Sequence, residues 1–247
     1  MRIVFVVLIS WLTFIVGYSQ QLLLIEKKGV ISLVGADSYS ASGFFEGGAF
    51  TIQSNLCKTN GGSFVGYNLD KDSLILYLNN AGKITYKKCH LDLELRKQVL
   101  SGVFLTSDVY QGKRRYKTSK SEILVSTDGE INCYRNKEIL WKKESNTWGY
   151  KLFTFGNRLF NPVISNSEDC ILFTSSKSYN NLIEIDLRTG QERLIDKNVR
   201  DYSYSHNDKY ILVVKPDIFY SKYYLYNKDA QESIELYGVT KAFWLFR

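Results

Sequence analysis

One pattern recurs along this chain: two short strands of alternating hydrophobicity joined by a tight turn. It is clearest in Asn181–Ile195, which reads NLIEIDLRTGQERLI. Apolar and acidic side chains alternate from Ile183 to Leu187, and this period of two predicts a strand. Gly190 can adopt the positive φ that a tight turn requires, so Gln191–Ile195 is predicted to return as a second strand.

The same pattern occurs four more times, at Leu22–Gly35, Ser73–Lys88, Gly129–Glu144 and Lys222–Leu236. Repeats of roughly 40–55 residues that are built from hairpins predict an all-β β-propeller, in which each repeat forms a four-stranded blade. Each returning strand carries one apolar residue that we expect to pack between its own blade and a neighbour. These five residues are Leu33, Tyr86, Trp141, Leu194 and Ile234.

The inner strands of the blades are predicted at Ser121–Asp128, Asp169–Ser176 and Lys209–Pro216, upstream of three of the hairpins. The last segment, Gly238–Arg247, predicts an inner strand that no hairpin follows. Five hairpins predict five blades. Pairing of the last strand with the first hairpin would close the ring and remove two exposed edges. The only helical candidate lies at Leu91–Leu100.

The N-terminus has the pattern of a signal peptide. A single Arg precedes the apolar run Ile3–Val16, and the small residues Gly17 and Ser19 follow it. The run is shorter than the ~20 residues that span a bilayer. We therefore expect a signal peptide at residues 1–19, a single β-propeller domain at residues 20–247, and a periplasmic or extracellular location.

The chain contains four cysteines, at positions Cys57, Cys89, Cys133 and Cys170. Export permits disulfides, and four bridged cysteines would allow three pairings. Buried free thiols that fill strand positions are an equal alternative. No two cysteines have the CxxC spacing, which disfavours a zinc knuckle.

Two segments, Ser165–Ile195 and Ser205–Leu236, resemble the repeats of TolB-type, WD40-like propellers. That family has a Ser-Pro-Asp-Gly turn, a strand, a polar loop and an Asp-x-x-Thr-Gly hairpin. Asp169 and Asp208 match the turn aspartate, although the family's proline and glycine are absent. In addition, Gly129–Glu144 resembles a PQQ-type propeller repeat. The resemblance implies a fold and neither a function nor a quinone cofactor, because propellers host binding, scaffolding and catalysis alike.

No motif of a metal site or of a serine hydrolase is present, so we expect neither a metal nor a cofactor. Gly61–Gly66 lacks the lysine of a phosphate-binding loop and predicts a turn into a strand. The net charge is +7, with one dense basic patch at Gln111–Lys120, either a solvated loop or a contact for an acidic partner. The candidate binding residues are Lys113, Arg114, Arg115 and Lys117.

The innermost strands are predicted further upstream, at Gly43–Ile52, Trp148–Phe155 and Val199–Ser203. Carboxylates offer an alternative, because Glu46, Asp108 and Asp201 lie near predicted inner strands. Glycoside hydrolases on five-bladed propellers need two carboxylates that flank the scissile bond. A chain with 25 acidic residues would place some of them there by chance. We therefore expect an exported, non-enzymatic module that binds a protein or an acidic glycan in the cell envelope, and not nucleic acid. A carbohydrate-active propeller enzyme is the alternative.

Overall fold

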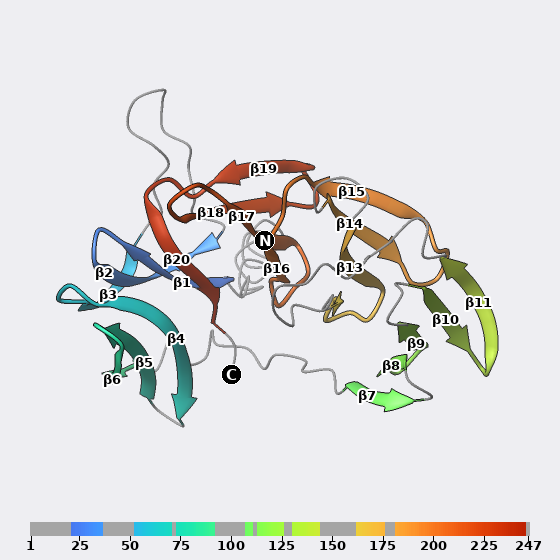
Figure 1. Ribbon diagram of the computed structural model, residues 1–247, viewed down its shortest axis with the longest axis horizontal. Helices are drawn as coiled ribbons and strands as arrows, with labels where there is room; N and C mark the ends of the chain where they lie inside the picture. Colours follow the sequence, from blue (N-terminus) through green and yellow to red (C-terminus); the bar gives the residue numbers. More distant parts are fainter. Residues whose placement is uncertain are drawn as a thin grey trace, which may run out of the picture.

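The structure, a computed structural model, describes residues 21–36, 52–70, 73–91, 107–110, 113–125, 130–143, 162–175 and 181–245. Within these ranges every regular element is a β-strand (Figure 1). The strands are β1 Leu22–Lys27, β2 Val30–Gly35, β3 Ile52–Lys58, β4 Ser63–Asp70, β5 Ser73–Asn80, β6 Lys83–His90, β7 Ser107–Tyr110, β8 Lys113–Lys117, β9 Glu122–Val125, β10 Ile131–Arg135, β11 Glu138–Lys143, β12 Val163–Ile164, β13 Cys170–Ser175, β14 Asn181–Asp186, β15 Glu192–Asp196, β16 Asp201–Tyr204, β17 Tyr210–Pro216, β18 Ser221–Asn227, β19 Glu232–Glu235 and β20 Val239–Trp244.

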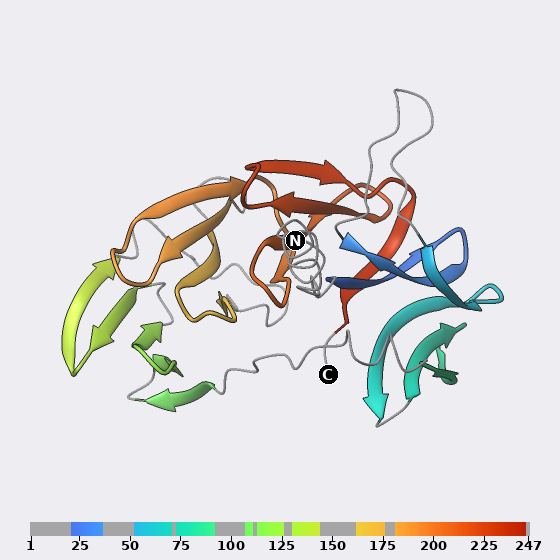
Figure 2. The same ribbon diagram turned by 180° about the vertical axis from the view of Figure 1, so that it is seen from behind.

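The strands form five antiparallel sheets, with the orders β20-β1-β2-β3, β4-β5-β6, β7-β8-β9-β10-β11, β12-β13-β14-β15 and β16-β17-β18-β19. The predicted pairing of the chain ends is present, since β20 pairs with β1 and places Leu23 opposite Trp244. In Figures 1 and 2 the sheets lie side by side along an arc, with the β4–β6 sheet at one end and the β7–β11 sheet at the other. The described residues include no helix that could cross a bilayer.

Buried apolar clusters fill four contacts between sheets that are neighbours on this arc. Strand β1 shows how the sequence achieves this. Its four consecutive apolar residues alternate between two clusters: Leu22 and Leu24 pack toward β4–β6, and Leu23 and Ile25 pack toward β17 and β18. A strand that is buried on both faces needs an unbroken apolar run, and this explains why LLLI does not alternate with polar residues.

Two of these contacts are reinforced by carboxylates that reach from a turn of one sheet to the equivalent turn of the next. Asp208, before β17, accepts the backbone N–H groups of Asn166 and Ser167, each at 2.7 Å. Glu168, in the turn before β13, likewise accepts the N–H of Ser119 at 2.6 Å. Each acid thus pairs backbone donors that the neighbouring strand ladder leaves without a partner.

These turns correct one sequence assignment. Glu168, and not Asp169, is the counterpart of Asp208. Each of the two lies three residues after a serine, Ser165 or Ser205, and each has a positive φ, 59° and 58° respectively. The resemblance to TolB-type repeats pairs Asp169 with Asp208 because that motif carries aspartate at this place.

Asp208→Asn is expected to lower the free energy of unfolding by about 1–2 kcal/mol, because one oxygen and the negative charge are lost at two backbone donors. Urea denaturation measures the change. Asp229→Asn, in the exposed β18–β19 turn, is the matched control and should stay within about 0.5 kcal/mol of wild type. Equal effects of the two variants would show that the inter-sheet contact does not stabilise the fold.

The predicted equivalence of five apolar residues in the hairpins is wrong. Leu33 is fully buried, whereas Tyr86 is 74% and Leu194 49% exposed. The physical reason is the position of each strand in its sheet. Leu33 lies on β2, which β3 covers, whereas β6 and β15 are edge strands. Only Trp141 and Ile234 are half-buried, as a packing position at a sheet edge would require.

The predicted inner strands correspond to β9, β13 and β17, and the predicted final strand to β20. The predicted signal peptide at residues 1–19 lies outside the described residues, and so does the helical candidate Leu91–Leu100 apart from Leu91.

Candidate functional site

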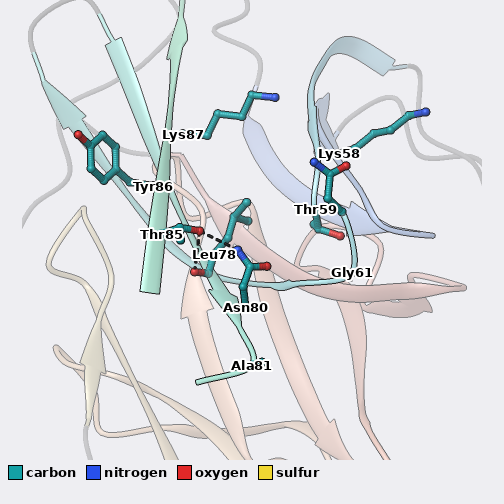
Figure 3. Close-up of a pocket in the computed structure, with 10 residues that line it drawn as sticks. Lys58, Thr59, Gly61, Leu78, Asn80, Ala81, Thr85, Tyr86 and Lys87 are labelled. Atoms are coloured by element: carbon teal, nitrogen blue, oxygen red, sulfur yellow. Dashed lines mark hydrogen bonds between the residues drawn. The ribbon is translucent and has the colours of Figure 1, made fainter. Parts of the chain in front are cut away.

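A polar cleft of about 500 Å³ lies between the loop that follows β3 and the β5–β6 hairpin (Figure 3). One wall is the segment Lys58–Gly61. The other wall and the floor come from the hairpin. The hairpin residues that line the cleft are Leu78, Asn80, Ala81, Thr85, Tyr86 and Lys87.

The two walls approach each other closely because Gly62 has no side chain. A Cβ atom at this position would lie 1.9 Å from Asn80 Oδ1 and 3.1 Å from the carbonyl oxygen of Asn79. The floor is fixed by hydrogen bonds. Asn80 Nδ2 donates to Thr85 Oγ1 at 2.8 Å, and Thr85 Oγ1 donates to the carbonyl of Leu78 at 3.4 Å (dashed in Figure 3). The cleft is therefore shaped by the close backbone approach at Gly62 and by these side-chain hydrogen bonds.

The chemistry of the lining is that of hydrogen-bond donors and positive charge. Lys58 and Lys87 are both exposed, and they belong to opposite walls of the cleft. Figure 3 shows that Lys87 and Tyr86 leave β6 on opposite sides, so the phenol stands at the rim. None of the described lining residues carries a carboxylate. This arrangement suits an anionic, hydroxyl-rich ligand and lacks the carboxylate pair that glycoside hydrolysis needs.

Two buried cysteines belong to the apolar cluster that supports the cleft. Burial raises the pKa of both the Cys57 and the Cys89 thiol, although the positive charge of Lys87 opposes the shift. Cys89 Sγ lies 3.9 Å from the carbonyl oxygen of Leu56. All four cysteines are free thiols, so in this structure they act as packing residues and not as bridges.

The predicted basic patch is not a loop. Residues Lys113–Lys117 form β8, which is paired on both sides, with β7 and with β9. Arg115 lies 3.8 Å from the carboxylate of Glu122, and Lys117 is exposed. The side chains of Lys113 and Arg114 lie outside the description of the structure. Figure 1 places this strand at the opposite end of the arc from the cleft.

Of the three candidate catalytic acids, only Asp201 has a described side chain, and it does not line the cleft. Asp108 lies on β7, where its backbone is opposite Arg115, and its side chain is not described. Asp201 is the exposed first residue of β16 and accepts the N–H of Tyr202 at 2.9 Å. Glu46 lies outside the described residues. Among the residues that are described, no group of three or more histidine, cysteine, aspartate or glutamate side chains could hold a metal ion.

The cleft residues were not predicted from the sequence. The signal was present in two turn sequences, Asn60-Gly61-Gly62 and Asn80-Ala81-Gly82. Asn60, Gly61, Ala81 and Gly82 all have positive φ, so both turns are tight. Their proximity could not be predicted, because a turn sequence specifies local geometry and not which other turn it meets.

No family model matches the chain, and no curated protein matches it. Solved structures do show similarity. TolB from Acinetobacter baumannii is 14% identical, with 89% of this chain and 55% of that chain covered and a TM-score of 0.36. A eukaryotic initiation factor is 11% identical, with coverages of 91% and 54% and a TM-score of 0.39. The tricorn protease is 11% identical, with coverages of 86% and 25% and a TM-score of 0.38. The chain thus spans between a quarter and just over half of these structures.

Proposed function

We propose that this chain is an exported, non-enzymatic β-propeller that binds an acidic glycan or a protein in the cell envelope. In this proposal the five sheets are five blades, and the pairing of β20 with β1 joins the first and last strands within one blade. The support is the shared apolar cores between consecutive sheets and the composite sheet built from both ends of the chain. The predicted signal peptide supports a periplasmic or extracellular location.

The observation that carries a glycan ligand is the composition of the cleft. The ammonium groups of Lys58 and Lys87 would pair with the carboxylate of a sugar acid. The amide groups of Asn60 and Asn80 offer both donors and acceptors to ring hydroxyls. The exposed ring of Tyr86 adds an apolar face at the rim, where a pyranose can make dispersion contacts.

Lys58→Ala/Lys87→Ala is expected to weaken the binding of a uronic acid oligosaccharide at least tenfold, because each charge-assisted hydrogen bond contributes about 1.5–3 kcal/mol. Isothermal titration calorimetry measures the affinity. The methyl ester of the same oligosaccharide tests the charge, because it retains the hydroxyl groups and loses the carboxylates. We expect the ester to bind as weakly to wild type as the acid binds to the variant.

Lys83→Ala/Lys88→Ala is the matched control. It removes the same charge from exposed positions of β6 that do not line the cleft, and it should leave the affinity unchanged. If both variants lose the same affinity, the effect comes from the overall charge of the protein and not from the cleft lysines. Absence of binding by wild type to any sugar acid would contradict the proposed ligand. Release of new reducing ends during incubation would instead favour the alternative, a carbohydrate-active enzyme that uses Glu46, Asp108 or Asp201.

The basic strand β8 is proposed as a second contact, for an acidic protein. Its residues Lys113, Arg114, Arg115 and Lys117 lie in one strand and in a different sheet from the cleft. A partner held by these charges should dissociate as salt is raised, because exposed ion pairs are screened. Pull-down from envelope extract at low and high salt tests this contact.

A further inference from the structure

The turn between β17 and β18 presents three consecutive apolar side chains to solvent. Ile218, Phe219 and Tyr220 are 86%, 91% and 62% exposed. Ile218 and Phe219 are the two most exposed large apolar side chains in the described part of the chain, and Tyr86 follows at 74%. A contiguous exposed apolar group of this kind indicates an interaction site, because soluble surfaces seldom carry one without a use.

The turn is held in a defined conformation. The backbone N–H of Asp217 donates to the carbonyl of Tyr220 at 3.0 Å, and the N–H of Ile218 donates to Asp217 Oδ1 at 2.7 Å. Lys222 Nζ lies 3.3 Å from the Asp217 carboxylate. The three side chains therefore project from a tip whose backbone is preformed, and little backbone entropy remains to be lost when the tip is buried.

We propose that this tip inserts into the interface of a phospholipid bilayer that carries anionic headgroups. A convex tip needs no complementary pocket in a bilayer, and Tyr is one of the side chains enriched at that depth. Three cations lie at the base of the tip: Lys215, Lys222 and Arg200. Arg200 donates a hydrogen bond to Ser221 Oγ at 3.3 Å. Asp196 and Asp217 pair with the two lysines, and the carboxylates of Asp201 and Glu235 also lie close enough to act on this base. The base therefore has no net positive charge, and the preference for anionic headgroups rests on the charge of the whole chain. The net charge of +7 attracts the whole chain to an anionic surface.

Co-sedimentation with vesicles tests the proposal. The probes are phosphatidylcholine vesicles with and without phosphatidylglycerol. Wild type is expected to bind the anionic vesicles more tightly than the neutral ones. Ile218→Ser/Phe219→Ser should weaken binding to the anionic vesicles by about a hundredfold, since each apolar side chain that enters the bilayer contributes on the order of tenfold or more. Thermal melting of this variant should match wild type, because both side chains are solvent-exposed.

Ile139→Ser/Leu140→Ser is the matched control, since these two consecutive side chains on β11 are 59% and 40% exposed and lie in another sheet. It should sediment like wild type. A Trp in place of Phe219 should give a blue-shifted emission on addition of anionic vesicles. The proposal is overturned if wild type does not sediment with anionic vesicles. The proposal is also overturned if the tip variant sediments as well as wild type. If the tip captures a protein and does not bind vesicles, the tip is a contact for a protein pocket instead.

Discussion

Trp141→Ala is expected to lower the free energy of unfolding by about 3 kcal/mol, the lower end of the range for deleting a large buried aromatic side chain. Trp141 lies on β11, and its indole N–H donates to the carbonyl of Leu187, in the β14–β15 turn of the next sheet, at 3.0 Å. Gly190 lies directly against the ring, because a Cβ there would be 2.9 Å from Trp141 Cγ. The side chain therefore joins two sheets. Its removal leaves a void, and the Leu187 carbonyl keeps only the weak thiol donor Cys133 Sγ, at 3.7 Å.

Two variants separate the contributions to this effect. Trp141→Phe keeps most of the packing and loses the hydrogen bond, so about 1 kcal/mol is expected. Leu194→Ala, at a 49% exposed position on the neighbouring edge strand, should cost under about 1 kcal/mol. Equilibrium urea unfolding of the three variants measures the series. If Leu194→Ala costs as much as Trp141→Ala, the contact with Gly190 is not what stabilises this edge.

Gly190→Ala provides an independent check of the same contact. It should destabilise the protein, because φ at this position is +72° and the added methyl group meets the indole. In the Trp141→Ala background the steric part of the cost disappears and only the backbone part remains. A double-mutant cycle should therefore show coupling between the two positions.

The strand pattern was predictable from the sequence because alternation, turn residues and apolar runs are local signals. The hairpin at Asn181–Ile195 is present as β14 and β15, and the last strand, β20, pairs with β1 as expected. The local signals did not predict which strands lie in the middle of a sheet and which lie at its edge. Leu22–Gly35 has the same hairpin pattern as the others, yet β1 and β2 are the middle strands of their sheet.

The basic segment shows a second limit of local signals. Five residues that include four cations suggested a loop, because charged runs usually face water. Lys113–Lys117 is nevertheless the strand β8, with backbone hydrogen bonds on both sides. Its fourth residue, Tyr116, is 6% exposed and belongs to an apolar cluster. The burial of Tyr116 and the backbone hydrogen bonds on both edges favour a strand more strongly than the charged side chains favour a solvated loop.

The candidate cleft could not be predicted because it depends on a contact between distant turns. Gly62 is required by the closeness of Asn80 and not by any unusual dihedral of its own. The same holds for the carboxylates between turns: Asp208 was recognised as a turn residue, but its partners at Asn166 and Ser167 belong to another sheet. Interactions between repeats are absent from the pattern of a single repeat.

Glu184→Gln is expected to cost about 2–3 kcal/mol, because it removes the negative charge at the centre of a buried ionic cluster. Glu184, on β14, is 5% exposed. Its carboxylate is 2.6 Å from Lys228 Nζ, 2.5 Å from Arg193 Nη2 and 2.8 Å from Tyr204 Oη. The substitution keeps the shape of the side chain and leaves two cations without their counter-charge. Arg193 retains some contact with solvent, and this places the expected cost below the maximum for a buried pair.

Glu192→Gln is the matched control on the adjacent strand. Its ion pair with Lys143, at 2.8 Å, is partly exposed, so a loss of under about 1 kcal/mol is expected. Urea denaturation near neutral pH compares the two. Equal losses would mean that burial does not strengthen the Glu184 cluster.

The pH dependence of the Glu184 effect follows from the direction of its pKa shift. Burial alone would raise the pKa of Glu184, but the hydrogen bond and charge of Lys228, together with Tyr204 and Arg193, lower it below the usual value of 4.5. Because the pKa is lower in the folded state, the carboxylate's contribution is complete above the unfolded value and is lost as the pH falls through the folded one. The difference in unfolding free energy between wild type and Glu184→Gln should therefore be constant above about pH 5 and shrink in more acidic solution. The other carboxylates titrate in both proteins, so their contributions cancel in the difference. A difference that keeps its full size in strong acid would mean that Glu184 acts through packing and not through charge.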